Sequence, residues 1–174
     1  MMNYWVLQMN PNMFPVTRDY SLDRVQGKRD WWGITKYLNK MEKDDVIFIW
    51  HSIDKRNSKV PKDRGIYATG KVISVPPHTP DVQKQIDQLK QQEGPQFLEP
   101  TEKTKQEAKP SIFIQYVKSY TQHPLTYHEM VDADLDSIHI ITYPNQEICI
   151  LSESEATEII KLLEAHTSDP PPNS

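Results

Sequence analysis

The sequence predicts an α+β fold in which a curled mixed β-sheet or small open barrel is flanked by short helices. Apolar runs of strand length recur along the chain, Pro and Asn break them, and the helical patterns between them are short. This order does not fit the regular strand–helix alternation of a parallel α/β sheet. The 174 residues are expected to form one domain over 1–167, followed by a disordered polar tail at 168–174.

Strands are predicted where apolar residues run continuously or alternate with polar ones. The first run ends at Asn10-Pro11, because proline supplies no amide donor and disfavours helix at the residue before it. A later run ends at Pro76-Pro77 for the same reason. The predicted strands and extended segments are Asn3–Met9, Val46–Trp50, Gly65–Val75, Ser111–Tyr120, Asp136–Thr142 and Glu147–Leu151.

Helices are predicted from apolar residues at helical spacing and from N-terminal caps. Thr126 and Ser152 each stand three residues before a Glu, which is the spacing of a capping box. The segment 79–110 is rich in Lys, Gln, Glu and Pro, and it is expected to be a polar surface insertion that begins with a short amphipathic helix. The predicted helices are Tyr20–Gln26, Ile34–Met41, Asp81–Gln92, a turn at Thr126–Glu129, and Ser152–His166.

Positive charge is concentrated in the N-terminal half, although the formal net charge of the chain is −4. Between Arg18 and Lys71 there are 13 Lys and Arg against 8 Asp and Glu, whereas the rest has 7 against 16. Such asymmetry lets one face of an acidic protein attract phosphate; the alternative is chance clustering on solvated loops. Trp31, Trp32 and Trp50 are expected near strand ends or in a connecting loop, where a ring can stack on a flat ligand.

Several kinds of catalytic and metal site are absent from the sequence. Gly65–Val72 approaches a phosphate-binding loop, but Val72 replaces the required Ser or Thr and the segment is predicted to be a strand. His128-Glu129 lacks the second histidine of a zinc-hydrolase helix, and no serine has the context of a nucleophile elbow. We therefore expect no enzymatic activity, no cofactor and no metal.

The single cysteine and the hydropathy indicate the compartment. Cys149 lies in an apolar run, so it is expected to be a buried structural thiol. One cysteine excludes an internal disulfide framework and fits the reducing cytoplasm. No apolar run reaches the length of roughly 18 residues that a membrane span needs, so no membrane association is expected.

Four segments occur in order along the chain: YWVLQMNP near the N-terminus, the W-x-I-x-K-Y pattern at Trp32–Tyr37, the predicted strand DVIFIW, and GIYATGKVIS. Together they resemble the EVE domain, a member of the PUA-like group related to YTH domains. The resemblance spans nearly the whole chain, from Asn3 to His166. It departs from the family pattern at Asp44-Asp45, where Gly-Asp is usual, and in the length of the 79–110 insertion.

The resemblance implies a PUA-like mixed β pseudo-barrel flanked by short helices, which binds nucleic acid bearing a modified base. EVE domains are associated with modified cytosine in DNA, and YTH domains hold a methylated adenine between aromatic rings. By position, Trp32 matches the loop tryptophan of the YTH cage, Asn10 an asparagine that bonds the base edge, and Ser52 a polar residue after the central strand.

Physical chemistry supports the same kind of ligand, because a flipped base gains about 1–3 kcal/mol from stacking on an aromatic ring. Amides such as those of Asn10 and Asn12 would read the base edge. The candidate base-binding residues are Asn10, Asn12, Trp32, Thr35, Trp50 and Ser52. The candidate phosphate-binding residues are Arg18, Lys28, Arg29, Lys36, Lys55, Arg56, Lys59 and Arg64.

Each candidate has a structural alternative. One ring of the pair Trp31-Trp32 would point inward, and we assign Trp32 to the pocket. Trp50 would serve equally well in the core. Asn10 would otherwise cap the turn before the proline, and the loop lysines and arginines would otherwise be solvated charges.

The leading hypothesis is a non-catalytic nucleic-acid-binding module that recognises a modified base by flipping it into an aromatic pocket. DNA is favoured over RNA, and the protein is expected to act as a monomer that serves a separate effector protein. One alternative is an ASCH-like hydrolase of a modified nucleoside, in which Thr35-Lys36 would contribute polar groups. Another is a protein-interaction module that uses the insertion and the acidic C-terminal half.

Overall fold

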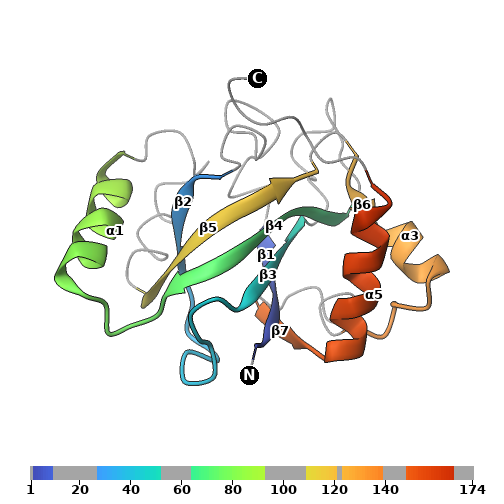
Figure 1. The fold of residues 1–174 in the computed structure, drawn as a ribbon, viewed down its shortest axis with the longest axis horizontal. Helices are drawn as coiled ribbons and strands as arrows, with labels where there is room; N and C mark the ends of the chain where they lie inside the picture. The colour runs from blue at the N-terminus through green and yellow to red at the C-terminus, as the bar shows by residue number, and fades with distance from the viewer. Residues whose placement is uncertain are drawn as a thin grey trace.

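The computed structural model describes residues 2–9, 27–51, 64–92, 109–120, 123–138 and 148–166. Within these ranges the chain forms a mixed seven-stranded sheet in the order β2-β5-β4-β3-β1-β7, and β6 pairs with β4 (Figure 1). The strands are β1 Tyr4–Met9, β2 Arg29–Gly33, β3 Val46–His51, β4 Gly65–Ser74, β5 Ser111–Ser119, β6 Leu125–Thr126 and β7 Ile148–Leu151. The helices are α1 Pro80–Gln92, α3 Tyr127–Asp132 and α5 Glu153–Glu164. The predicted α+β class is confirmed.

The first strand lies next to the edge strand β7, between a parallel and an antiparallel neighbour. β1 pairs with β3 in parallel, from Tyr4 beside Val46 to Met9 beside His51. On its other side β1 pairs with β7 in antiparallel fashion. β1 and β3 therefore end side by side, with Met9 and His51 as register partners.

Both faces of the sheet carry apolar clusters, because successive residues of a strand point to opposite faces. We call one the strand cluster, since none of its members comes from the three helices. It consists of Trp5, Leu7, Ile34, Met41, Ile47, Ile49, Tyr67, Ala68, Val72, Ile112, Ile114, Tyr116 and Ile148. Four partly buried side chains pack against it: Trp32, Tyr37, Leu38 and Val75.

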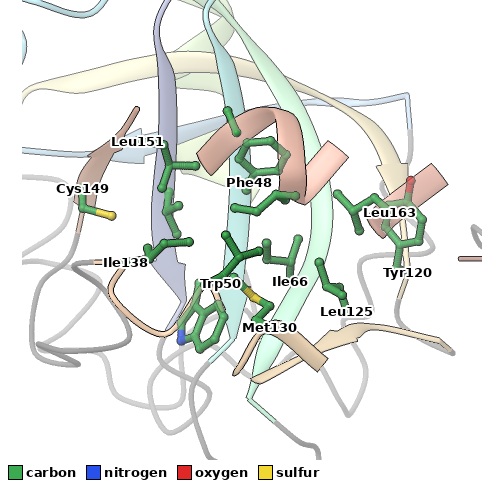
Figure 2. Close-up of a cluster of buried hydrophobic side chains, with 14 residues drawn as sticks. Phe48, Trp50, Ile66, Tyr120, Leu125, Met130, Ile138, Cys149, Leu151 and Leu163 are labelled. Carbon is green, nitrogen blue, oxygen red and sulfur yellow. The ribbon is translucent and has the colours of Figure 1, made fainter. Parts of the chain in front are cut away.

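The opposite face is covered by the helices, with α1 at the end of the sheet formed by β2 and β5 and with α3 and α5 at the other end (Figure 1). We call the larger apolar group there the helix-covered cluster; it joins strand residues to side chains of α3 and α5. Ten of its members are labelled in Figure 2: Phe48, Trp50, Ile66, Tyr120, Leu125, Met130, Ile138, Cys149, Leu151 and Leu163. The smaller group, the α1 cluster, is Trp31, Ile86 and Phe113.

The two capped helices form as predicted. The Thr126 hydroxyl accepts the backbone N–H of Glu129, and the Glu129 carboxylate accepts the backbone N–H of Thr126. The same reciprocal pair joins Ser152 to Glu155 at the start of α5. Each pair satisfies amide groups that an uncapped helix end would leave without a partner.

The predicted helix over Ile34–Met41 is wrong. This segment consists of bends and turns, and Tyr37 has a left-handed backbone with φ of 64°. The amides of Lys40 and Met41 both donate to the Tyr37 carbonyl, while the amide of Ile34 donates to the Pro110 carbonyl. Ile34 therefore continues the pairing of β2 with the β5 side of the sheet, and the left-handed backbone of Tyr37 interrupts the dihedral angles that a helix needs. The apolar spacing reflects burial in the strand cluster, not a helix face.

One further expectation needs correction. DWW does not lie in a connecting loop, because Asp30, Trp31 and Trp32 are part of β2. The amphipathic helix expected at the start of the 79–110 segment is α1, which packs on β2 and β5 and buries Ile86 completely. Tyr20–Gln26, residues 139–142 and the tail at 168–174 lie outside the described residues.

Candidate functional site

The adjacent residues Trp31 and Trp32 occupy opposite faces of the sheet, because β2 is extended at this point. Trp31 is only 5% exposed in the α1 cluster, and the Lys90 ammonium lies 4.8 Å from the centre of its ring. Trp32 is half-buried and packs against the strand cluster on the other face. Trp32 is thus partly accessible to solvent, whereas Trp31 anchors the strand.

A hydrogen-bonded chain holds Trp32 from inside the sheet. The Trp32 indole Nε1 donates to the Tyr116 hydroxyl at 3.3 Å. The Tyr116 hydroxyl in turn donates to Asp30 Oδ2 at 2.8 Å, and the backbone N–H of Trp31 donates to Asp30 Oδ1 at 2.8 Å. An indole can only donate and a carboxylate can only accept, so the direction of this chain is set by its two ends.

Asp30 is the acidic member of this chain and lies within the sheet. It is 8% exposed. Burial raises the pKa of its carboxyl from 3.8 to about 6, against the opposing effects of the hydrogen bonds from the Tyr116 hydroxyl and the Trp31 amide. Desolvation therefore outweighs two hydrogen bonds to the charged form.

Three of the predicted residues lie close to Trp32 in the chain and are exposed: Lys28, Thr35 and Lys36. Lys28 precedes β2, and its carbonyl accepts the amide of Tyr116 at 2.9 Å, so its backbone lies beside the hydrogen-bonded chain. Thr35 and Lys36 belong to the turn that follows β2. These exposed groups stand on both sides of Trp32 along the chain.

Two predicted phosphate-binding arginines lie elsewhere. The Arg29 guanidinium is 5.7 Å from the centre of the Phe113 ring and donates to the Gln85 side chain of α1 at 3.3 Å. It is therefore on the α1 face, opposite to Trp32. The Arg64 guanidinium lies 4.0 Å from the centre of the Tyr127 ring, next to α3. Neither arginine is placed beside the Trp32 ring.

The assignment of Trp50 to the same pocket as Trp32 is corrected by the structure. Trp50 is 2% exposed and belongs to the helix-covered cluster, where Figure 2 shows its indole near Met130 and Ile66. Trp32 packs against the strand cluster, on the other face of the sheet. The two rings cannot therefore form walls of one pocket. The physical reason is strand alternation, which sends Trp50 to the face that α3 and α5 cover.

The remaining candidates lie outside the described residues. The residues that precede Asn10 and Ser52, namely Met9 and His51, are register partners at the ends of β1 and β3. The roles of these candidates stay predictions. They are Asn10, Asn12, Arg18, Ser52, Lys55, Arg56 and Lys59.

Asp30 and Tyr116 are the members of the site that sequence reasoning missed. They are 86 positions apart in the chain, and pairing of β2 with β5 brings them together. Asp30 stands inside a strand, where an acidic residue is rare, and this is the one local signal that would have drawn attention to it.

Other kinds of site are not found in the described part of the chain. No three His, Cys, Asp or Glu side chains there are grouped so that they could hold a metal ion. Nor do the described helices include one that is long and apolar enough to cross a membrane.

Comparison with solved structures shows that other proteins share this fold. A hypothetical protein from Leishmania major has 18% identity and a TM-score of 0.58, and the match covers 95% of this chain and 96% of that one. The human THYN1 protein, solved in complex with DNA containing 5-methylcytosine, has 16% identity and a TM-score of 0.58, covering 93% and 98%. Protein PSPTO5229 from Pseudomonas syringae has 15% identity and a TM-score of 0.55, covering 91% and 98%. At these identities the likeness establishes the fold.

A comparison with functionally curated proteins gives no significant match. The family model of the EVE domain, in contrast, matches residues 3–162. This range includes the whole sheet, α1, α3 and most of α5. The resemblance found in the four sequence segments is thereby confirmed, and the chain belongs to the EVE domain family.

Proposed function

We propose that this protein binds nucleic acid and recognises a modified base, a modified cytosine in DNA, by stacking it on Trp32. The observation that carries the proposal is a half-buried indole that packs on the core with its N–H hydrogen-bonded inward. Membership of the EVE family and the 5-methylcytosine DNA bound by the human THYN1 protein support it. In this function the protein is not an enzyme and acts as a cytoplasmic monomer for a separate effector protein.

The energetics require an accessible ring. A base inside a duplex cannot be inspected for a small mark, so it must leave the stack at a cost of a few kcal/mol. Stacking on an aromatic side chain returns about 1–3 kcal/mol, and burying one methyl group adds about 0.8 kcal/mol. Of the four tryptophans, Trp5, Trp31 and Trp50 are at most 5% exposed, so Trp32 is the one whose ring offers a surface for stacking.

Affinity for the backbone of the nucleic acid would come from the exposed positive charges. Lys28 and Lys36 flank Trp32 along the chain and are exposed. Contacts of this kind bind phosphate without regard to sequence and weaken as salt concentration rises. The lysines would therefore set overall affinity, while Trp32 would set the preference for the modified base.

Trp32→Ala tests the proposal. Titration of the variant with paired oligonucleotides, with and without 5-methylcytosine, should show that the preference of the wild type is lost while salt-sensitive binding persists. Trp32→Phe is the matched control, because a smaller ring still stacks, and it should retain part of the preference. A preference that survives unchanged in Trp32→Ala would refute the assignment of the base to this ring.

A hydrolase of modified nucleosides is a second candidate, because Asp30 adds a buried acid to the polar groups of Thr35 and Lys36. Its pKa of about 6 is in the range used for general acid–base catalysis. Both of its oxygens already accept hydrogen bonds inside the sheet, however, which favours a structural role. Release of free base or acyl group from modified nucleosides at high protein concentration would establish the hydrolase and overturn the non-catalytic assignment.

A further inference from the structure

We propose that Tyr116 and Asp30 are positioning residues that hold the Trp32 ring in the orientation that stacks on the base. This inference rests on the proposed function, since it explains how that ring would be ready before ligand arrives. Neither residue is among the candidates that the sequence suggested. Both lie beneath the accessible ring, so they act through it and not on the ligand.

The hydrogen bonds from Trp32 to Asp30 are the first reason to expect that the ring is held in place. Trp32 donates to Tyr116, Tyr116 donates to Asp30, and the second Asp30 oxygen accepts the Trp31 amide. Rotation of the Trp32 ring away from this position would break its bond to Tyr116 and leave the N–H to find another acceptor. A buried hydroxyl that is itself fixed by a carboxylate is a directional acceptor, because its own proton is committed elsewhere.

The second reason is that backbone hydrogen bonds fix Tyr116 beside the start of β2. The Tyr116 amide donates to the Lys28 carbonyl at 2.9 Å, and the Gly27 amide donates to the Tyr116 carbonyl at 2.9 Å. Gly27 has a left-handed φ of 82°, a conformation that glycine adopts without steric cost. Tyr116 is thus fixed to the same stretch of chain that bears Asp30 and Trp32.

The third reason is that the opposite face of β2 is anchored by a buried side chain. Trp31 is buried under α1, beside Ile86 and Phe113. This anchor resists rotation of β2 about its axis and therefore sets the direction in which the Trp32 side chain leaves the backbone. Trp31 therefore fixes the orientation of the backbone at Trp32, and Tyr116 fixes the orientation of the Trp32 ring.

An ordered ring matters for binding because a side chain that is already fixed loses little conformational freedom when the base stacks on it. Loss of one hydrogen bond of ordinary strength corresponds to about a five-fold change in an equilibrium constant. We therefore expect Tyr116→Phe, which removes only the hydroxyl, to lower affinity for the modified oligonucleotide about five-fold. Affinity for the unmodified one, which depends on phosphate contacts, should change less.

The test compares Tyr116→Phe in the wild-type and Trp32→Phe backgrounds. Phe at position 32 has no N–H to donate, so removal of the Tyr116 hydroxyl should have little further effect there. Tyr120→Phe is the matched control, since Tyr120 is a buried tyrosine of the helix-covered cluster on the other face. It should leave the preference unchanged. Equal losses from Tyr116→Phe in both backgrounds would overturn the inference, because the hydroxyl would then act independently of the indole.

A spectroscopic measurement tests the positioning without any ligand. The NMR signal of the Trp32 indole N–H can be assigned by its absence in Trp32→Phe. Its exchange with solvent should accelerate in Tyr116→Phe and in Asp30→Ala, and less so in Asp30→Asn, whose carbonyl can still accept the Tyr116 hydroxyl. Unchanged exchange in Tyr116→Phe would refute the tether.

The two proposals can fail separately. If wild type shows no preference for any modified oligonucleotide, the proposed function fails, while indole exchange still decides whether Tyr116 holds the ring. If Trp32→Ala removes the preference but Tyr116→Phe keeps it in full, the base-binding role of Trp32 stands and the positioning role of Tyr116 is overturned.

Discussion

The burial of Asp30 predicts a particular dependence of stability on pH. Its carboxyl has a pKa of about 6 in the folded protein, against 3.8 for the ordinary group. The folded state therefore binds this proton more tightly than the unfolded state does. The stability from this group is fully present below the unfolded value and is lost as pH rises through the folded value. Asp30 thus makes the protein less stable at neutral pH than near pH 4, relative to a variant without the carboxyl.

The size of this effect on stability follows from the pKa shift of Asp30. At about 1.4 kcal/mol for each pKa unit, the difference between 3.8 and about 6 corresponds to roughly 3 kcal/mol in the free energy of unfolding. The linkage relation predicts that about 2 kcal/mol of this change in the free energy of unfolding occurs between roughly pH 4.5 and pH 7, a range in which unfolding can be measured. Because Asp30 is buried, solvent screening reduces this little.

Asp30→Asn is the matching perturbation, because it keeps the side-chain shape and removes the charge. Urea unfolding of wild type and variant across this pH range gives the two free energies of unfolding. The stability of wild type relative to Asp30→Asn should fall by about 2 kcal/mol as pH rises from about 4.5 to 7. Parallel pH profiles for the two proteins would refute the reasoning, since they would mean that the carboxyl titrates alike in the folded and unfolded states.

Two further predictions concern the placement of side chains around the sheet. Trp50→Leu should lower the free energy of unfolding by about 3 kcal/mol, measured in urea, because the indole fills the helix-covered cluster. The folded variant should keep the preference for a modified base. Loss of that preference would mean that Trp50 contacts the base. Gly65→Ala should be destabilising, because the added methyl would meet the Leu125 carbonyl where β6 pairs with β4. A melting temperature equal to that of wild type would contradict that close approach.

Much of the secondary structure could be predicted because it depends on local signals. Continuous apolar runs indicated β3 and β4, and the Thr126 and Ser152 capping boxes marked the starts of α3 and α5. β2 was missed because two adjacent tryptophans hide the alternation of a strand. Both rings find apolar partners, Trp31 under α1 and Trp32 on the strand cluster, so both faces of β2 pack against apolar side chains.

The candidate site was predictable only in part. The exposed Lys28, Thr35 and Lys36 and the half-buried Trp32 lie close together in the chain. Trp32, Thr35 and Lys36 fall within the W-x-I-x-K-Y pattern, and Lys28 was suggested by the distribution of positive charge. The separation of Trp32 from Trp50 depends on which strand face each residue occupies and on which helices cover that face. That information is spread over the whole sheet and is not present in either local segment.

The sequence by itself determined the α+β class, the capped helices, the EVE family and the stretch of chain that holds the candidate ring, because periodicity, caps and short motifs are local properties. Only the tertiary structure decided that Trp31 and Trp50 are buried, that Trp32 keeps an accessible surface, and that Asp30 and Tyr116 meet beneath it. Those outcomes depend on strand pairing across 86 positions and on the desolvation that packing imposes. Neither can be read from the residues one segment at a time.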